Sequence, residues 1–151
     1  MDEEMLAGPG AVPVYIKDKN SGLVLEYRDD STYEVVIEQK KDGDRKQQWI
    51  LTNSGVIGYV YILNKKDKRK VITASDKAQT PLYLTSKSSS LDKSQLWILR
   101  APDNGTNPYF VLMSANTGLV MDVVDGITDP GTHVQVYKNH SGPMQQFSFE
   151  Q

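Results

Sequence analysis

The sequence contains no cysteine and only two histidines, His133 and His140. Without thiols the chain can form neither disulfides nor thiolate metal sites. Two histidines are also too few for the common histidine-based zinc sites. We therefore expect a protein with no bound metal and no other cofactor.

The chain also lacks long apolar runs and a strong charge of either sign. No run approaches the ~20 apolar residues that a membrane-spanning helix needs. The balance of 17 basic against 19 acidic residues gives a net charge of −2, which favours neither nucleic acid nor membrane insertion. The acidic segment Met1 to Gly10 has no basic stretch followed by an apolar one, as a secretory signal would. We expect a cytoplasmic protein, or one released by a leaderless route.

One unit is present three times. The segment Gln47-Gln48-Trp49-Ile50-Leu51 recurs as Gln95-Leu96-Trp97-Ile98-Leu99 and, more weakly, as Gln145-Gln146-Phe147-Ser148-Phe149. The first glutamines of these segments are 48 and 50 positions apart. Fixed spacing of this kind is typical of repeat architectures.

A second landmark lies upstream of each segment and keeps the same register. Residues Asn20 to Glu26 (NSGLVLE) match Asn116 to Asp122 (NTGLVMD), and Arg69 to Thr73 fills this place in the middle copy. We divide the chain into a flexible tail, 1–12, and one domain, 13–151, with repeats at about 13–52, 53–100 and 101–151.

The local pattern within each copy is that of β-structure. Short segments rich in β-branched and aromatic residues predict about four strands per copy, or about 12 in all. Examples are Val14 to Ile16, Tyr33 to Ile37, Tyr59 to Leu63, Leu82 to Leu84, Tyr109 to Met113 and Val134 to Tyr137. Turn signals such as Asp42-Gly43, Asn104-Gly105 and Asp125-Gly126 separate them. No long amphipathic helix is predicted.

Three copies limit the possible all-β architectures. A propeller needs at least about four blades, and an open sandwich gives no reason for threefold repetition. A closed barrel with pseudo-threefold symmetry fits the number of copies and removes sheet edges. We therefore predict an all-β chain folded as a single β-trefoil.

The Gln-x-aromatic segment itself is best explained as scaffold. The aromatic ring can fill a shared core, and the glutamine amide can bond turn backbone that would otherwise lack partners. With this spacing, the three copies resemble the ricin-B-like (R-type) family of lectins and carbohydrate-binding modules, above all its small cysteine-free fungal members. The resemblance covers residues 13 to 151.

The resemblance implies one shallow sugar pocket per copy, and the third copy matches best. It places Asp122 at the acidic position, with Tyr137 eight residues before Gln145 as the stacking aromatic. The polar positions are filled by Gln135, Asn139 and His140, and the Asp125-Gly126 turn forms the wall. Gln145 is expected to orient Asp122 from behind. A carboxylate accepts sugar hydroxyls strongly, and an aromatic face covers the C–H patch of the ring.

The first two copies lack this combination. The first has Glu26 at the acidic position and Gln39 at the aromatic one, and the second has Thr73 with Thr85 or Lys87. We expect one working site, in the third repeat, and a homodimer that presents several sites together. The resemblance implies galactose or N-acetylgalactosamine on glycoproteins or glycolipids. In the third copy, Met144 stands where the family often has a sugar-contacting asparagine.

The sequence allows four other interpretations. The basic run Asn64 to Lys70 is typical of a nucleic-acid patch or nuclear address, but it occupies a hairpin position and we expect a solvated turn. Asp122 and Asp125, three residues apart and expected on an exposed loop, make a poor glycosidase pair, so we predict no enzyme. The main alternative is a trefoil module that binds protein, as a protease inhibitor or cytoskeletal partner. A module from a larger enzyme is the other.

Overall fold

A computed structural model describes residues 12–104 and 107–151. Residues 1–11 of the expected tail lie outside the described residues, as does Gly105 of the predicted Asn104-Gly105 turn. Within the described ranges, no helix is both long and apolar enough to cross a membrane.

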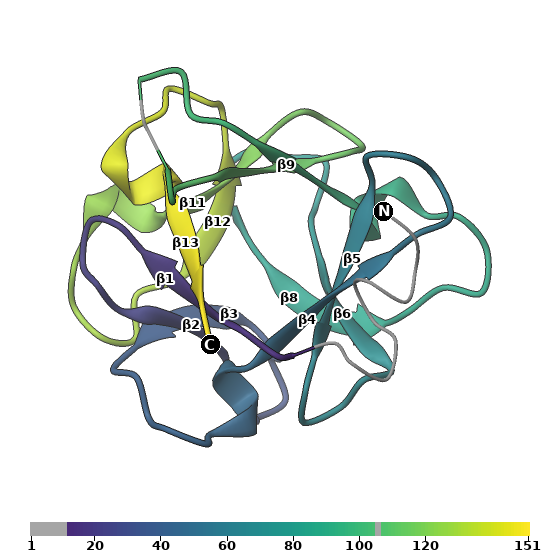
Figure 1. The fold of residues 1–151 in the computed structure, drawn as a ribbon, viewed down its shortest axis with the longest axis horizontal. Coiled ribbons are helices and arrows are strands. Elements are labelled where there is room, and N and C mark those ends of the chain that lie inside the picture. The colour runs from purple at the N-terminus through teal and green to yellow at the C-terminus, as the bar shows by residue number, and fades with distance from the viewer. Residues whose placement is uncertain (1–11, 105–106) are drawn as a thin grey trace.

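The described part of the chain forms thirteen short strands and four single turns of 3₁₀-helix (Figure 1). The strands are β1 (Tyr15–Asp18), β2 (Val24–Tyr27), β3 (Val35–Glu38), β4 (Trp49–Asn53), β5 (Val60–Asn64), β6 (Lys70–Thr73), β7 (Thr80–Pro81), β8 (Tyr83–Ser86), β9 (Trp97–Arg100), β10 (Val111–Ser114), β11 (Val120–Val123), β12 (Val134–Tyr137) and β13 (Phe147–Glu150). The 3₁₀ turns are η1 (Arg45–Gln47), η2 (Lys93–Gln95), η3 (Val124–Gly126) and η4 (Pro143–Gln145).

Six strands close into a barrel. Antiparallel pairing joins β13 to β1, β4 to β5, β5 to β9 and β9 to β10. Two isolated bridges complete the ring, Val14 with Trp49 and Phe110 with Phe147. The first and last strands are therefore neighbours, as Figure 1 shows for β1 and β13. Closure leaves no free edge in this ring for a further strand to pair with.

Three hairpins form a cap on the barrel, one from each repeat: β2–β3, β6–β8 and β11–β12. Bridges join them to one another. Glu34 pairs with Tyr83, Val36 pairs with His133, and β7 pairs with β12. A six-stranded barrel with three linked hairpins is the pseudo-threefold arrangement predicted from the repeats, and the predicted β-trefoil is confirmed.

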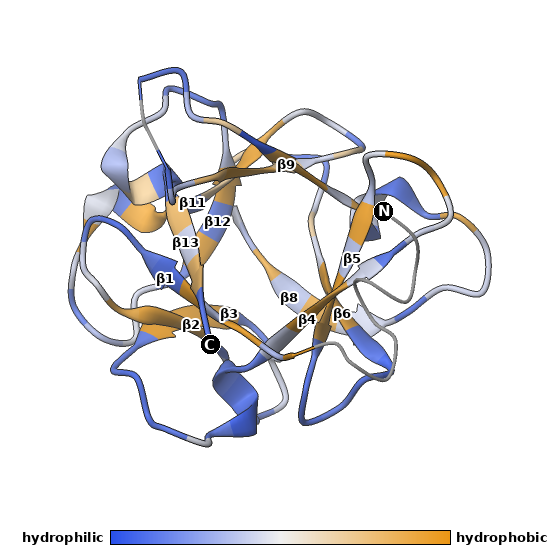
Figure 2. Cartoon of the chain, in the orientation of Figure 1, coloured by the Kyte–Doolittle hydropathy of each residue, from blue (hydrophilic) through white to orange (hydrophobic). Residues whose placement is uncertain are grey.

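The core lies where the three repeats meet. The aromatic residues of the repeated segment, Trp49, Trp97 and Phe147, are fully buried together with aliphatic residues of all three hairpins. Figure 2 shows hydrophobic colour concentrated on the strands and hydrophilic colour on the connecting loops. Each tryptophan also donates its indole N–H to a buried carbonyl, Trp49 to Leu25 at 3.1 Å and Trp97 to Ile72 at 3.0 Å.

Candidate functional site

The glutamine of each repeated segment holds the loop before it closed. Its side-chain carbonyl accepts a backbone N–H of that loop, and its amide nitrogen donates to a loop carbonyl. Gln47 accepts the N–H of Lys41 at 2.8 Å, Gln95 accepts that of Ser88 at 2.9 Å, and Gln145 accepts that of His140 at 2.9 Å. The carbonyl acceptors are Gln39, Ser86 and Lys138, at 2.8, 2.9 and 2.9 Å. This shared role is structural, because all three repeats use it.

The second amide proton distinguishes the repeats. It goes to Glu26 Oε1 at 2.9 Å in the first, to Thr85 Oγ1 at 3.0 Å in the second and to Asp122 Oδ2 at 2.8 Å in the third. The Gln145–Asp122 bond has the geometry expected of a residue that orients the aspartate from behind.

Asp122 lies on β11 and is 3% exposed, so the expectation that it sits on an exposed loop is wrong. The reason is that the strand continues through Val123, and only Asp125 reaches solvent. Both carboxylate oxygens of Asp122 are held, Oδ2 by Gln145 and Oδ1 by Gln135 Nε2 at 3.1 Å. Each carboxylate oxygen has a second lone pair, so Asp122 keeps the capacity to accept further hydrogen bonds.

A small pocket of about 110 Å³ opens over Asp122. Its walls bring together most of the residues predicted for the site: Asp122, Asp125, Gly126, Gln135, Tyr137 and His140, with Met144 beside them. Gln145 is fully buried behind this wall. Asn139 is not part of the wall, since its side-chain oxygen accepts the N–H of Ser141 at 2.9 Å and shapes the turn.

His140 has a defined orientation. The N–H of Gly142 donates to its Nδ1 at 3.1 Å, so the neutral ring carries its proton on Nε2. Nε2 lies 3.9 Å from Asp122 Oδ2, which is too long for a direct hydrogen bond. A ligand hydroxyl between these two atoms can accept from His140 and donate to Asp122. The ring of Tyr137 meets His140 edge-on, with centroids 6.2 Å apart.

The turn at the pocket rim needs unusual backbone angles. Asp125 and Gly126 have φ values of 54° and 65°, which favour glycine and tolerate aspartate. A Cβ on Gly126 would meet Met144 Cε at 2.9 Å. The Gly126 carbonyl accepts Asn20 Nδ2 at 2.9 Å. The first loop of the first repeat therefore fixes the site of the third.

Sequence reasoning missed Gln79, which comes from the second repeat. Its N–H donates to the carbonyl of Val136 at 2.7 Å, beside the pairing of β7 with β12, and its side chain lines the pocket. No repeat landmark points to it. A second hollow of about 530 Å³ shares Gln79 and Gln135 with the pocket and continues over Val124 and Ile127.

Strand pairing corrects the residue assigned to the aromatic position in the first repeat and decides between the two candidates in the second. Tyr137 lies opposite Val120, and in the first repeat the residue opposite the matching Val24 is Glu38, not Gln39. The loop before Gln47 is one residue longer, so counting back from the glutamine failed. In the second repeat Thr85, and not Lys87, lies opposite Val71. Neither position is aromatic.

A second buried aspartate lies close to the site. Asp18 on β1 is fully buried and accepts hydrogen bonds from Asn20 N, Ser21 N and Ser21 Oγ. Burial raises the pKa of the Asp18 carboxyl above 3.8, and the nearby charge of Asp122 adds to this, whereas the hydrogen bonds oppose it. The folded state therefore binds the Asp18 proton more tightly than the unfolded state does.

This linkage predicts the effect of Asp18→Asn. The Asp18 contribution to stability is fully present below pH 3.8 and is lost as pH rises through the raised folded pKa. The variant should therefore become more stable relative to wild type as pH rises from 3.5 to 7. The free energies of unfolding are measured by urea titrations at several pH values. A difference that stays constant or shrinks with pH would contradict the assignment. Asn64 fills the matching position in the second repeat, where it accepts Lys66 N at 2.8 Å.

Side chains that could bind a metal ion are not clustered in the described part of the chain. Among residues 12–104 and 107–151, no group of three or more histidine, aspartate or glutamate side chains is placed to hold a metal ion. The arrangement around Asp122 is one of hydrogen-bond acceptors and donors beside an aromatic ring. It suits a small ligand rich in hydroxyl groups.

The closed ring with its hairpin cap defines the fold class, and comparison with known families agrees. The ricin-type β-trefoil lectin domain matches residues 12–147, and the chain belongs to this family. No curated protein matches the chain.

Solved structures share the fold at low sequence identity. A Macrolepiota procera ricin B-like lectin in complex with lactose has a TM-score of 0.75 and 16% identity, with 93% of this chain and 96% of that one covered. The C-half of an earthworm R-type lectin in complex with GalNAc has 0.70 and 22%, with 91% and 97% covered. An exo-β-1,3-galactanase from Clostridium thermocellum has 0.80 and 24%, with 94% of this chain but 30% of that one covered. Membership of the lectin family supports carbohydrate binding, and the solved structures support the fold.

Proposed function

We propose that this protein is a lectin without enzymatic activity, and that it binds glycans ending in galactose or N-acetylgalactosamine through one site in the third repeat. The observation that carries the proposal is the environment of Asp122. This buried carboxylate is held by two glutamines at the floor of a pocket with an aromatic wall. Such a carboxylate can accept two hydroxyl groups of one sugar, while Tyr137 covers its C–H face.

The choice of sugar rests on similarity. The Macrolepiota lectin is in complex with lactose and the earthworm lectin with GalNAc. A pocket of about 110 Å³ is small beside ligand pockets of ~300–1,000 Å³, so it holds part of one sugar. The adjoining hollow over Ile127 gives a second sugar residue room to bind.

The geometry of the site supports the proposed absence of catalysis. Asp122 is held by Gln135 and Gln145, and Asp125 is exposed on the turn. A glycosidase pairs a carboxylate with an acid across the scissile bond. Asp122, already held by two glutamines, and Asp125, exposed on the turn, do not form such a pair. Incubation with lactose should therefore release no galactose.

Tyr137 tests the proposal through a pair of variants. Tyr137→Phe keeps the ring face and should bind lactose within about threefold of wild type, whereas Tyr137→Ala should bind at least about tenfold more weakly, because stacking on the sugar is lost. The measurement is a glycan array of wild type followed by calorimetric titration of the best ligand. The proposal fails if wild type binds no glycan on the array, or if Tyr137→Ala binds as wild type does.

A further inference from the structure

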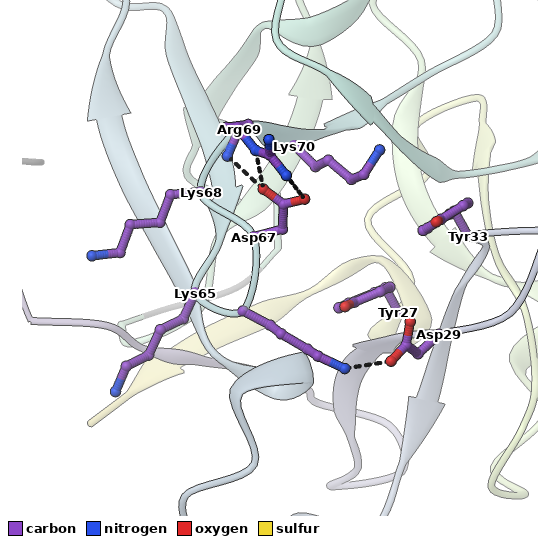
Figure 3. A pocket seen from close by; sticks show the side chains of 9 residues that line it. Tyr27, Asp29, Tyr33, Lys65, Asp67, Lys68, Arg69 and Lys70 are labelled. Carbon is purple, nitrogen blue, oxygen red and sulfur yellow. Dashed lines mark hydrogen bonds and ion pairs between the residues drawn. The ribbon is translucent and has the colours of Figure 1, made fainter.

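A further hollow, distinct from the third-repeat pocket and from the hollow beside it, lies at the seam between the first and second repeats. Residues Lys65 to Arg69 connect β5 to β6, and Lys70 is the first residue of β6; five of the six residues Lys65 to Lys70 are basic. Together with Tyr27, Asp29 and Tyr33 they line a hollow of about 560 Å³ (Figure 3). This volume falls within the ~300–1,000 Å³ of typical ligand pockets. Its lining carries five cations and two carboxylates, although the whole chain has a net charge of −2.

The hollow occupies the place that matches one edge of the third-repeat pocket. Asp29 follows Glu26 by three positions, as Asp125 follows Asp122. Asn20 and Lys66 occupy equivalent positions in the first and second repeats. The backbone N–H of Asn20 donates to the side chain of Asp18, and that of Lys66 donates to the side chain of Asn64. Asn20 reaches Gly126 of the third repeat, and Lys66 pairs with Asp29 of the first. At this seam a cation replaces the neutral amide.

The tyrosines form one wall. The rings of Tyr27 and Tyr33 are nearly parallel, with centroids 6.4 Å apart, and Lys70 Nζ lies 4.8 Å from the Tyr33 ring centre. Tyr33 has a φ of 54°, which is unfavourable for a bulky side chain. Its carbonyl accepts the N–H of Leu84 at 2.9 Å, which helps to hold this conformation. Strained residues of this kind concentrate at ligand sites.

The charges are only partly neutralised. Asp29 pairs with Lys66, and Asp67 pairs with Arg69 Nε at 3.1 Å. Lys70 extends toward Tyr33, while Lys65 and Lys68 point away from both tyrosines (Figure 3). Of the three cations without a paired carboxylate in this lining, only Lys70 extends toward the aromatic wall, beside the Lys66–Asp29 pair. An anionic group entering here gains charge-assisted hydrogen bonds.

We propose that this hollow binds an acidic saccharide, one that carries sulfate esters or carboxylates. Lys66 and Lys70 would bind the anionic group, and Tyr33, which is 36% exposed, would contact the sugar ring. The proposal does not depend on the third-repeat pocket. Nucleic acid is the less suitable ligand, because neutralising 6–10 phosphates requires cations spread along a backbone, whereas these lie in one loop of an acidic chain.

The test uses two double variants that remove the same charge from the same loop. Lys66→Gln/Lys70→Gln removes the cations beside Asp29 and Tyr33. Lys65→Gln/Lys68→Gln removes the two that point away. Binding to a heparin hexasaccharide is measured by calorimetry at 0.15 M salt. Further ligands are the desulfated hexasaccharide, which keeps its carboxylates, neutral maltohexaose, and a single-stranded oligonucleotide of equal charge.

The expected result is binding of the sulfated hexasaccharide, weakened at least about tenfold in Lys66→Gln/Lys70→Gln and less than about threefold in the control pair. Weaker binding of the desulfated form would assign sulfate as the main group, and equal binding would assign the carboxylates. The proposal is overturned if wild type binds neither acidic hexasaccharide, if both double variants lose affinity equally, or if maltohexaose or the oligonucleotide binds as tightly.

Discussion

Asp122→Asn should weaken lactose binding by at least about 100-fold. Hydrogen bonds to a charged group contribute ~1.5–3 kcal/mol each, and 1.4 kcal/mol is a tenfold change in affinity. Two such bonds from sugar hydroxyls are lost or weakened when the carboxylate becomes a neutral amide. The new NH₂ group also faces an amide donor of Gln145 or Gln135, so the site loses order as well. Calorimetric titration with lactose provides the measurement.

Glu26→Gln is the matched control. Glu26 accepts the same bond from Gln47 in the first repeat, at 2.9 Å, and it is also buried. The change removes one negative charge from the equivalent position and should leave lactose affinity within about twofold of wild type. Thermal unfolding of both variants checks that they fold. If Glu26→Gln weakens binding as much as Asp122→Asn, the site is not confined to the third repeat.

Trp97→Ala should have the largest effect on stability. Trp97 is fully buried where the repeats meet, and truncating a large buried aromatic costs ~3–5 kcal/mol. The variant also leaves the buried carbonyl of Ile72 without the indole donor at 3.0 Å. Since a domain's total stability is ~5–15 kcal/mol, urea should unfold this variant at a much lower concentration.

Trp97→Phe separates the two causes. The third repeat already uses Phe147 at this position, so most of the packing is kept. The loss of the donor to Ile72 should cost about 1–3 kcal/mol. Leu91→Ala, at a side chain 53% exposed, should change stability by less than about 0.5 kcal/mol. Equal stability of Trp97→Ala and Leu91→Ala would contradict the role of the aromatic core.

The fold was predictable because repetition constrains it. The Gln-x-aromatic segments place one core ring and one loop clamp in each repeat, and three copies leave few all-β solutions. The site was partly predictable for the same reason, since the landmark before Asp122 fixes its place on β11 opposite Gln135. The exposure of Asp122 was predicted wrongly, because sequence does not show that the strand continues to Val123.

Contacts between repeats could not be predicted from the sequence. Gln79 enters the pocket through the pairing of β7 with β12, and Asn20 fixes the Gly126 turn from more than a hundred residues away. No regular spacing in the sequence predicts either contact. The same holds for the seam where Lys66 meets Asp29, since the basic run alone predicts only a solvated turn.

The central claim is that one sugar site exists and lies in the third repeat. An amide-proton NMR titration of the isotope-labelled chain with lactose tests it most directly. We predict saturation at one lactose per chain, with the largest shift changes at Asp122, Asp125, Gly126, Tyr137 and His140 and none around Glu26 or Thr73. Shift changes of equal size in all three repeats, or changes centred on the first or second, would contradict it.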